Sequence, residues 1–572
     1  MASKDEARIS YTTLLSHLDA QVESILPNQV VGKARSDRGG FVSAAEGMAG
    51  SAQFGCAQAL GFAWLCEGSR YFGDSEILDR LALASNFAKE IRRPSGRFDL
   101  FSTNWDCGPY TAFVVQALAP MVAAARRSSL PGAEQIEQQW SDIIRLAVPG
   151  MVAGGFHTPN HRWVLTSALS QALTLYPDLD TLSTIEAYLA ETVDINPDGE
   201  YTERSTAVYN AICNRSLRLT AESLNCPELL DPVRQNLDAS YRLLHADGSV
   251  ITSLSNRQDR GKRVVPVSMI DSYYALARID ENGFYASVAD WLSSFDHAAV
   301  PWSIEPFLSH PEWRDDDLER STLPTHYNHL MPESGVWRTR RGKRSATAAI
   351  GITSPFCVRQ GNIDVNVKIC ATYFGLGQFK GDRLIPTDSG VRLEFDGKGR
   401  RHDGPIYSHP VGHAVSMEDY HDVMMEREVT VMDPLEMSLD VREVEGGFDL
   451  RLVTSEPFDN IPVEVLFAFS PGGTLHSECM IIDGTAGHTA FLRRGFAIYH
   501  KGADAISIGP GTITHRMRDM RNSEPEPTAF RLLTTLITPV DHTIQIRTGV
   551  WSEATEAILK QDPENTVEES NQ

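Results

Sequence analysis

The hydrophobic periodicity of this 572-residue chain changes between residues 311 and 335. Before this stretch, apolar residues recur every three or four positions, as they do in amphipathic helices. After Gly335, apolar and polar residues alternate, as they do in half-buried strands. A chain of this length also exceeds what one hydrophobic core supports. The sequence therefore predicts a helical domain over residues 1–325, a β domain over 333–552 and an acidic polar tail over 553–572.

The helical half consists of segments of similar length that are joined by short turns containing Gly, Pro or Asp. Such helices favour a ring or solenoid of helix pairs, and no sequence repeat at a fixed period is visible. The predicted helices cover residues 45–67, 110–127, 136–148, 160–175, 182–192, 206–224 and 232–244.

The β half is predicted to form a large antiparallel sandwich, because Gly, Asp and Pro turns separate its short alternating segments. The stretch 311–332 is rich in Asp and Pro and is predicted to be a linker. The basic run 338–344 is predicted to form a hairpin turn on a solvated face. The predicted strands cover residues 336–338, 346–352, 365–373, 391–395, 429–432, 437–441, 448–453, 463–469, 491–498, 532–537 and 543–546.

The formal net charge of −23 argues against nucleic acid or an anionic membrane as a partner. An anionic substrate would need a locally basic cleft. No apolar run approaches the ~20 residues of a membrane span, and no secretory signal is visible at the N-terminus. The eight cysteines are scattered, which predicts free thiols. These features predict a soluble, cytoplasmic protein.

Three junctions between a loop and a helix concentrate polar and aromatic residues in the helical half. The first carries Asn104 and Trp105 directly before a long apolar helix. An exposed indole with hydrogen-bonding neighbours suits a sugar-binding platform. The alternative is a helix cap with Trp105 in the core.

The second junction follows a diglycine turn at 154–155. Thr158 is the expected N-cap and Pro159 the expected first helical residue. The polar residues here are His157, Asn160, His161 and Arg162. Three of them fall in the first helical turn, where the helix dipole favours an anion. The junction is therefore a candidate substrate site.

The third junction spans residues 198–210. If a helix begins near Ser205, then Glu203, Tyr209 and Asn210 share one face. The alternative role for Tyr209 is that of a half-buried packing residue.

The Asn-His pair at 160–161 and the run Asp-Gly-x-Tyr-x-Glu-x-Ser-x-x-x-Tyr over 198–209 resemble motifs of the heparinase II/III-like polysaccharide lyases and the related alginate lyases. The Gly-Val-Trp-x-x-Arg segment at 335–340 extends the likeness, which covers roughly residues 40–550. The resemblance implies an incomplete (α/α) toroid followed by an antiparallel β-sandwich. It also implies cleavage of a 4-linked uronic-acid glycoside by β-elimination, which gives an unsaturated uronate.

In that family an Asn and a His hold the substrate carboxylate and a Tyr acts as base or acid. The matching catalytic residues here are Asn160, His161 and Tyr209. A tyrosine that acts as a base needs a nearby positive charge, and Arg162 or Arg204 is expected to supply it.

Further residues are expected to bind substrate. Arg257 and Gln258 belong to a basic run over 256–263 that either lines the cleft or forms an exposed loop. The full set of expected substrate-binding residues is Asn104, Trp105, His157, Arg162, Glu203, Arg204, Arg257, Gln258, Tyr407, His409 and His413.

The β half departs from the family pattern. Members usually bring a further His from the sandwich and often a metal held by His, Asp and His. Tyr407, His409, His413 and His421 are candidates for a metal site or a catalytic lid; the alternative is a loop without a special role. Because 356–379 lacks a His-rich pattern, no cofactor is expected, although a structural divalent metal in the sandwich stays open.

Two other functions remain open. A glycoside hydrolase would pair Asp106 with Glu200 or Glu203, and a non-catalytic protein would bind carbohydrate without turnover. In each case the expected partner is a poly- or oligosaccharide, acidic in the case of the lyase. Homodimerisation is left open.

Overall fold

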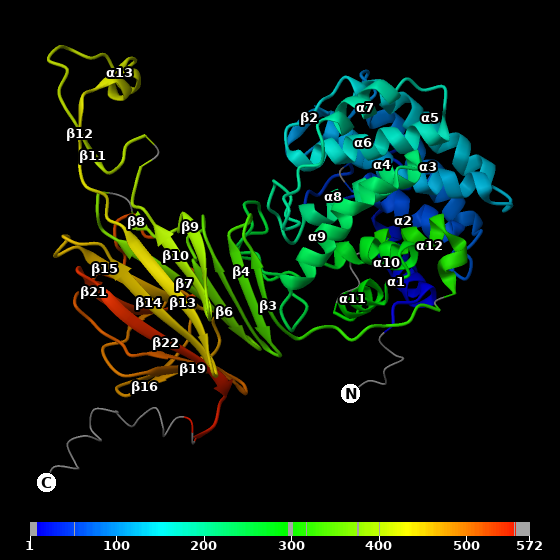
Figure 1. Cartoon of the computed structure of the whole chain (residues 1–572). Coiled ribbons are helices and arrows are strands. Elements are labelled where there is room, and N and C mark those ends of the chain that lie inside the picture. Colours follow the sequence, from blue (N-terminus) through cyan, green and yellow to red (C-terminus); the bar gives the residue numbers. More distant parts are fainter. Residues whose placement is uncertain are drawn as a thin grey trace, which may run out of the picture. The chain divides into compact units, whose positions relative to one another are not determined.

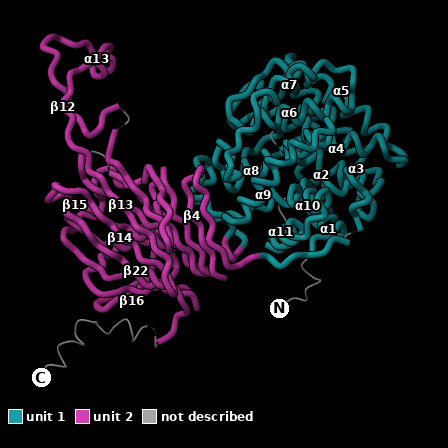
Figure 2. The backbone as a smooth tube through the Cα atoms, in the orientation of Figure 1, with its two compact units in different colours: residues 1–244, 248–323 teal, residues 245–247, 324–572 magenta. Residues whose placement is uncertain are grey.

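Both periodicities of the sequence appear in the folded chain as the structures they predict. A computed structural model describes residues 8–50, 52–295, 301–315, 317–374, 377–399, 401–553 and 555. Helices fill the first part and antiparallel strands the second, which confirms the predicted fold class (Figure 1). The chain divides into two units, residues 1–244 with 248–323 and residues 245–247 with 324–572 (Figure 2). Of the predicted tail, only residues 553 and 555 are described.

The first unit contains every predicted helix, with shifted ends, and additional ones that the periodicity did not reveal. Its described elements are α1 (Tyr11–Ile25), α2 (Gln53–Leu65), α3 (Ser75–Ile91), β1 (Phe98–Leu100), β2 (Asn104–Cys107), α4 (Gly108–Arg127), α5 (Ala133–Val152), α6 (Pro159–Leu175), α7 (Leu182–Ala190), α8 (Tyr209–Leu224), α9 (Leu230–Arg242), α10 (Ile270–Ile279), α11 (Gly283–Ser293) and α12 (Glu305–Ser309).

Alternate helices of this unit form an inner layer. Helices α2, α4, α6, α8 and α10 contact one another in succession, and α12 contacts both α10 and α2. The inner helices are buried almost all round, as α2 and α6 show, whereas the outer helix α9 buries a single stripe. This is the arrangement of an incomplete (α/α) toroid. Of the described helices, α4 alone has the length and apolar composition to cross a bilayer; 83% of its apolar stretch is buried, as in a core helix.

The second unit is an antiparallel sandwich with a separate small hairpin. Its described elements are β3 (His326–Met331), β4 (Val336–Arg341), β5 (Arg344–Ala349), β6 (Phe356–Gln360), β7 (Ile363–Ala371), β8 (Gly377–Gln378), β9 (Arg383–Thr387), β10 (Gly390–Phe395), β11 (Ile406–Ser408), α13 (Tyr420–Glu426), β12 (Val429–Val431), β13 (Met437–Val444), β14 (Gly447–Thr454), β15 (Pro462–Phe469), β16 (Thr474–Ser477), β17 (Ile481–Asp483), β18 (Thr489–Phe491), β19 (Ala497–Lys501), β20 (Asp504–Gly509), β21 (Phe530–Ile537) and β22 (Asp541–Val550).

Within the described residues, two nine-stranded sheets enclose one core. One sheet has the order β17-β16-β19-β20-β22-β14-β13-β10-β9, and the other has β18-β21-β15-β7-β6-β5-β4-β3 with β8 on β7. Alternate residues of facing strands, such as Val365 and Phe467 from one sheet and Leu450 and Ile546 from the other, meet in this core. Strands β11 and β12 pair only with each other among the described strands, and they carry α13 (Figure 1).

Three predictions for the second half need correction. The predicted linker contains β3, a polar edge strand paired with β4, in which alternation is hidden because both faces carry polar residues. The segment 491–498 is divided between β18 and β19, which belong to different sheets. The basic run does form the β4–β5 hairpin, but Arg338 is fully buried, where its guanidinium donates to Thr347 Oγ1 at 2.8 Å.

Candidate active site

The loops that precede α4, α6, α8 and α10 converge at one end of the helical ring. Asn104, just before α4, lies with its amide nitrogen 3.0 Å from His157 Nε2, just before α6. The His157 ring packs edge-to-face on His161, with centroids 4.6 Å apart. As predicted, Thr158 is the N-cap and Pro159 the first residue of α6. The positive ends of several helix dipoles therefore point at a common region.

Asn160 is linked to the third junction through Glu203. The Asn160 side-chain amide donates to Glu203 Oε2 at 2.6 Å, and its backbone N–H donates to the same oxygen at 3.1 Å. The other carboxylate oxygen, Oε1, lies 3.1 Å from Arg257 Nε. Glu203 thus holds an amide and a guanidinium side by side, and its own side chain is only 3% exposed.

Tyr209 is the first residue of α8, three positions after the start of the predicted helix 206–224. Its phenolic oxygen accepts a 2.6 Å hydrogen bond from Gln258 Nε2. The Arg257 guanidinium carbon lies 5.1 Å from the centroid of the Tyr209 ring. The loop before α10 thus contributes both a donor to the phenolic oxygen and a cation over the ring. The cation over Tyr209 is thus Arg257, whereas sequence analysis expected Arg162 or Arg204.

Asp259 joins the loop that carries Arg257 and Gln258 to the turn that precedes Tyr209. Its buried carboxylate accepts hydrogen bonds from the Ser205 hydroxyl at 3.1 Å and the Ala207 N–H at 3.0 Å. It also accepts one from the Ser255 hydroxyl at 2.8 Å. Sequence analysis missed Asp259, because one acidic residue inside a basic run carries no signal beyond charge balance.

His161 is uncharged at neutral pH. Burial, together with the positive charge of His157 and Arg257, lowers its pKa to about 4. Its Nδ1 and the Asn160 Oδ1 are buried and have no hydrogen-bond partner among the described residues. Because buried polar atoms are normally hydrogen-bonded, these two atoms are candidate contacts for a polar ligand.

Trp105 lies on the surface, so the alternative that placed it in the core is wrong. Its side chain is 72% exposed, and the Arg93 guanidinium carbon lies 3.4 Å from the ring centroid. Arg93 is itself held by Asp99, which also accepts the Asp106 N–H at 2.7 Å. The indole is therefore a fixed, exposed platform.

Arg162 and Arg204 are occupied elsewhere. The Arg162 guanidinium is buried and contacts Glu191 and Asp194, each at 2.8 Å. Arg204 Nε contacts Glu200 Oε1 at 2.9 Å. Arg162 thus neutralises carboxylates inside the helical unit, and it stands apart from the contacts that join Asn160, Glu203 and Tyr209.

Tyr407, His409 and His413 belong to the second unit. Tyr407 and His409 lie on or directly after β11, and His409 Nε2 is 2.7 Å from Thr430 Oγ1. His413 follows in the loop before α13, and its Nδ1 lies 2.9 Å from the Ala414 carbonyl. All three are exposed. Within the described part of the chain, no three His, Cys, Asp or Glu side chains are grouped so that they could hold a metal ion.

Comparison with known proteins finds similarity in structure. The chain resembles heparinase III (12% identity, 88% of this chain and 77% of that chain covered, TM-score 0.51). It also resembles the Streptomyces coelicolor A3 chondroitin AC lyase in complex with chondroitin sulphate (12%, 97% and 81%, TM-score 0.50) and a Paenibacillus xanthan lyase (9%, 96% and 58%, TM-score 0.52). No family model and no curated protein matches the sequence. The chain thus has the fold of the heparinase-like polysaccharide lyases, and at these identities the likeness shows the fold alone.

Proposed function

We propose that this chain is a polysaccharide or oligosaccharide lyase that cleaves a 4-linked uronic-acid glycoside by β-elimination. The observation that carries the proposal is the environment of Tyr209, whose oxygen accepts a hydrogen bond from Gln258 and whose ring lies beneath the Arg257 guanidinium. This group lies in the same cluster as Asn160 and His161, at the positive ends of ring helices. Solved structures with a similar fold are lyases of chondroitin and xanthan and a heparinase.

In the proposed reaction, Tyr209 removes the proton at C5 of the uronate. The C4–O4 bond breaks, a C4–C5 double bond forms, and the leaving O4 takes up the proton that Tyr209 removed from C5. General acid–base catalysis of this kind contributes about 10²–10⁴-fold to a rate. Gln258 and Arg257 stabilise the Tyr209 oxygen when it has lost its proton. The reaction uses protein side chains alone and needs no cofactor.

Removal of the C5 proton places negative charge next to the substrate carboxylate, which must be stabilised. Asn160 is suited to this, because one amide hydrogen is fixed on Glu203 and the other contacts Thr158 Oγ1 only at 3.3 Å. His161, neutral and with an unpartnered Nδ1, supplies a second polar contact. Glu203 positions Asn160 and Arg257, and exposed Trp105 offers a face for a neighbouring sugar.

The carboxylates that a hydrolase would use are engaged by other groups. Asp106 is bound by the Ser95 hydroxyl and lies 3.5 Å from Arg97. Glu200 pairs with Arg204, and Glu203 is held by Asn160 and Arg257. This arrangement favours the lyase over the hydrolase.

The test is a panel of uronate-containing glycans, each incubated with the full chain and followed by ultraviolet absorbance and by release of reducing sugar. The proposal predicts an absorbing unsaturated product from at least one glycan. Reducing ends without absorbance would instead establish hydrolysis, and silence in both assays over a broad panel would favour a binding protein.

A further inference from the structure

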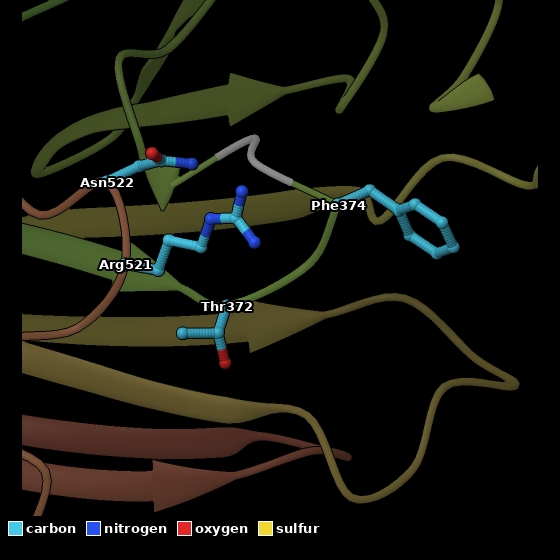
Figure 3. Close-up of a pocket in the computed structure, with 4 residues that line it drawn as sticks. All are labelled: Thr372, Phe374, Arg521 and Asn522. Atoms are coloured by element: carbon cyan, nitrogen blue, oxygen red, sulfur yellow. The ribbon is translucent and has the colours of Figure 1, made fainter. Parts of the chain in front are cut away.

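A cavity of about 370 Å³ opens in the second unit, at the end of strand β7. Thr372 and Phe374 come from the chain that follows β7, and Arg521 and Asn522 from the segment between β20 and β21. Figure 3 shows the Arg521 side chain in the space between Asn522 and Phe374, with the Phe374 ring extending away from it. The cavity has room for a sugar unit.

Arg521 is the cation of the 517–527 segment that no carboxylate of the described residues neutralises. The acidic residues of the segment over 517–527 are Asp519, Glu524 and Glu526. Asp519 contacts Arg531 at 3.0 Å, and both glutamates contact Lys368 of β7. Within the described ranges, no carboxylate lies within ion-pair distance of Arg521, and its side chain is exposed. The wall of the cavity therefore presents a positive charge, although the chain as a whole is strongly acidic.

The segment is anchored so that this charge has a fixed position. Met520 is buried, and the two glutamates tie the following residues to Lys368. Asn522 has a positive φ of 67°, and a Cβ on Gly377 would lie 2.6 Å from the Asn522 Cβ. Only glycine at 377 permits this approach, which brings the Asn522 amide to the cavity.

Phe374, which lines the cavity, belongs to an exposed aromatic pair. Phe374 and Tyr407 are 44% and 55% exposed, and their ring centroids lie 5.0 Å apart in an edge-to-face arrangement. Exposed aromatic faces beside a few polar groups are typical of sites that bind amphipathic small molecules. This contact also gives Tyr407 a partner in the second unit.

We propose that this cavity is a second saccharide-binding site, which takes an anionic sugar unit of the polymer chain. Arg521 pairs with the carboxylate or sulfate of that unit, since a guanidinium binds both in a bidentate manner. Asn522 and Thr372 hydrogen-bond to hydroxyl groups of the sugar. The inference that the ligand is an acidic saccharide rests on the proposed function. The cavity and its positive charge are features of the structure and do not depend on that function.

The test is electrophoretic retardation of the full chain in gels that contain alginate, polygalacturonate, heparin or neutral amylose, in a Tyr209→Phe background that prevents digestion of the polymer. Arg521→Ala is expected to weaken binding to an acidic polymer about tenfold, the usual effect of losing one charge-assisted hydrogen-bonded contact. Asn522→Gly, which keeps the positive φ, is expected to weaken it less. Retardation by alginate or polygalacturonate, which carry carboxylates and no sulfate, assigns the anion as a carboxylate. Retardation by heparin alone, which carries both groups, assigns a sulfate.

Arg518→Ala is the matched control, because Arg518 is an exposed arginine of the same segment that does not line the cavity. The inference is overturned if no acidic polymer retards the protein, if Arg521→Ala binds like its parent, or if Arg518→Ala weakens binding equally. Arg521-dependent retardation without any elimination product would overturn the proposed function and leave the second site standing. Formation of an elimination product, together with polymer binding that does not depend on Arg521, would support the proposed function and overturn the second site.

Discussion

Gln258 donates a 2.6 Å hydrogen bond from its amide to the phenolic oxygen of Tyr209, a residue 49 positions earlier in the chain. In the proposed elimination, this bond stabilises the Tyr209 oxygen once it has lost its proton. Gln258 lies in the loop before α10, and Tyr209 begins α8. The contact therefore couples two loops of the ring at the atom that the proposed elimination depends on.

Replacement of Gln258 by Leu removes the donor and keeps much of the side-chain volume. We expect kcat to fall about tenfold, the effect of losing roughly one hydrogen bond to a charged oxygen, while KM changes little. Steady-state kinetics on the active glycan of the panel measures both. Lys262→Gln, an exposed change in the same loop, serves as the control; equal kinetics for the wild type and Gln258→Leu would contradict the role of this bond.

Asp259→Asn tests whether the buried carboxylate positions the two loops. An amide cannot accept all the hydrogen bonds from Ser205, Ala207 and Ser255, so we expect a loss of about 1–3 kcal/mol in the free energy of unfolding. We also expect kcat to fall, because Gln258 and Tyr209 lose their alignment. Denaturant unfolding and kinetics at a temperature where the variant stays folded measure the two effects. Asp142→Asn, at an exposed site, should show neither.

His161 makes the stability of the helical unit depend on pH. Burial lowers its pKa to about 4, below the ordinary value of about 6.5. As the pH falls, His161 therefore takes up its proton at a higher pH in the unfolded chain than in the folded one. The contribution of neutral His161 to stability is complete above about pH 6.5 and is lost as the pH falls towards 4. The loss reaches about 3 kcal/mol at most. Thermal unfolding between pH 4.5 and 7.5 should show a smaller slope for His161→Gln, and no change of slope for the exposed His326→Gln.

Glu464 on β15 has the opposite dependence. Burial, together with the negative charge of Asp519, raises its pKa to about 7, while Arg531 opposes the shift. Between about pH 4.5 and 7, the folded state therefore keeps the Glu464 proton that the unfolded chain has released. The contribution of protonated Glu464 to stability is complete below about pH 4.5 and is lost as the pH rises through 7. Glu464→Gln is expected to stabilise the sandwich at pH 8, by up to about 3 kcal/mol, and to leave it unchanged at pH 4.5. An identical gain from the exposed Glu445→Gln would contradict this assignment.

Much of the fold could be predicted from the sequence, because periodicity reports which face of an element is buried. Helix α6 begins at Pro159 after Thr158 as expected, since Pro at the first helical position acts locally; the Thr158 side chain makes no capping hydrogen bond. Strand β3 could not be predicted, because a polar edge strand shows no alternation. The burial of Arg338 was equally hidden: its partner Thr347 lies across a hairpin, and a basic run ordinarily indicates solvent.

The candidate site could be predicted in its parts but not in its pairings. Asn160, Glu203 and Tyr209 stood out because each lies in a polar junction before a helix. That Glu203 joins Asn160 to Arg257, and that Arg257 rather than Arg162 lies over Tyr209, depends on contacts between loops that are distant in sequence. No local pattern encodes such contacts.

The most direct test of the central claim is the initial rate of ultraviolet absorbance for the wild type and Tyr209→Phe on the glycan that gives the strongest signal. Tyr209 is half-buried and Phe keeps its ring, so circular dichroism should show an intact fold. The account predicts a fall of at least about 10²-fold in kcat, the contribution of a general acid–base residue. A variant that retains the wild-type rate, or a wild type that releases reducing sugar without absorbance, would contradict it.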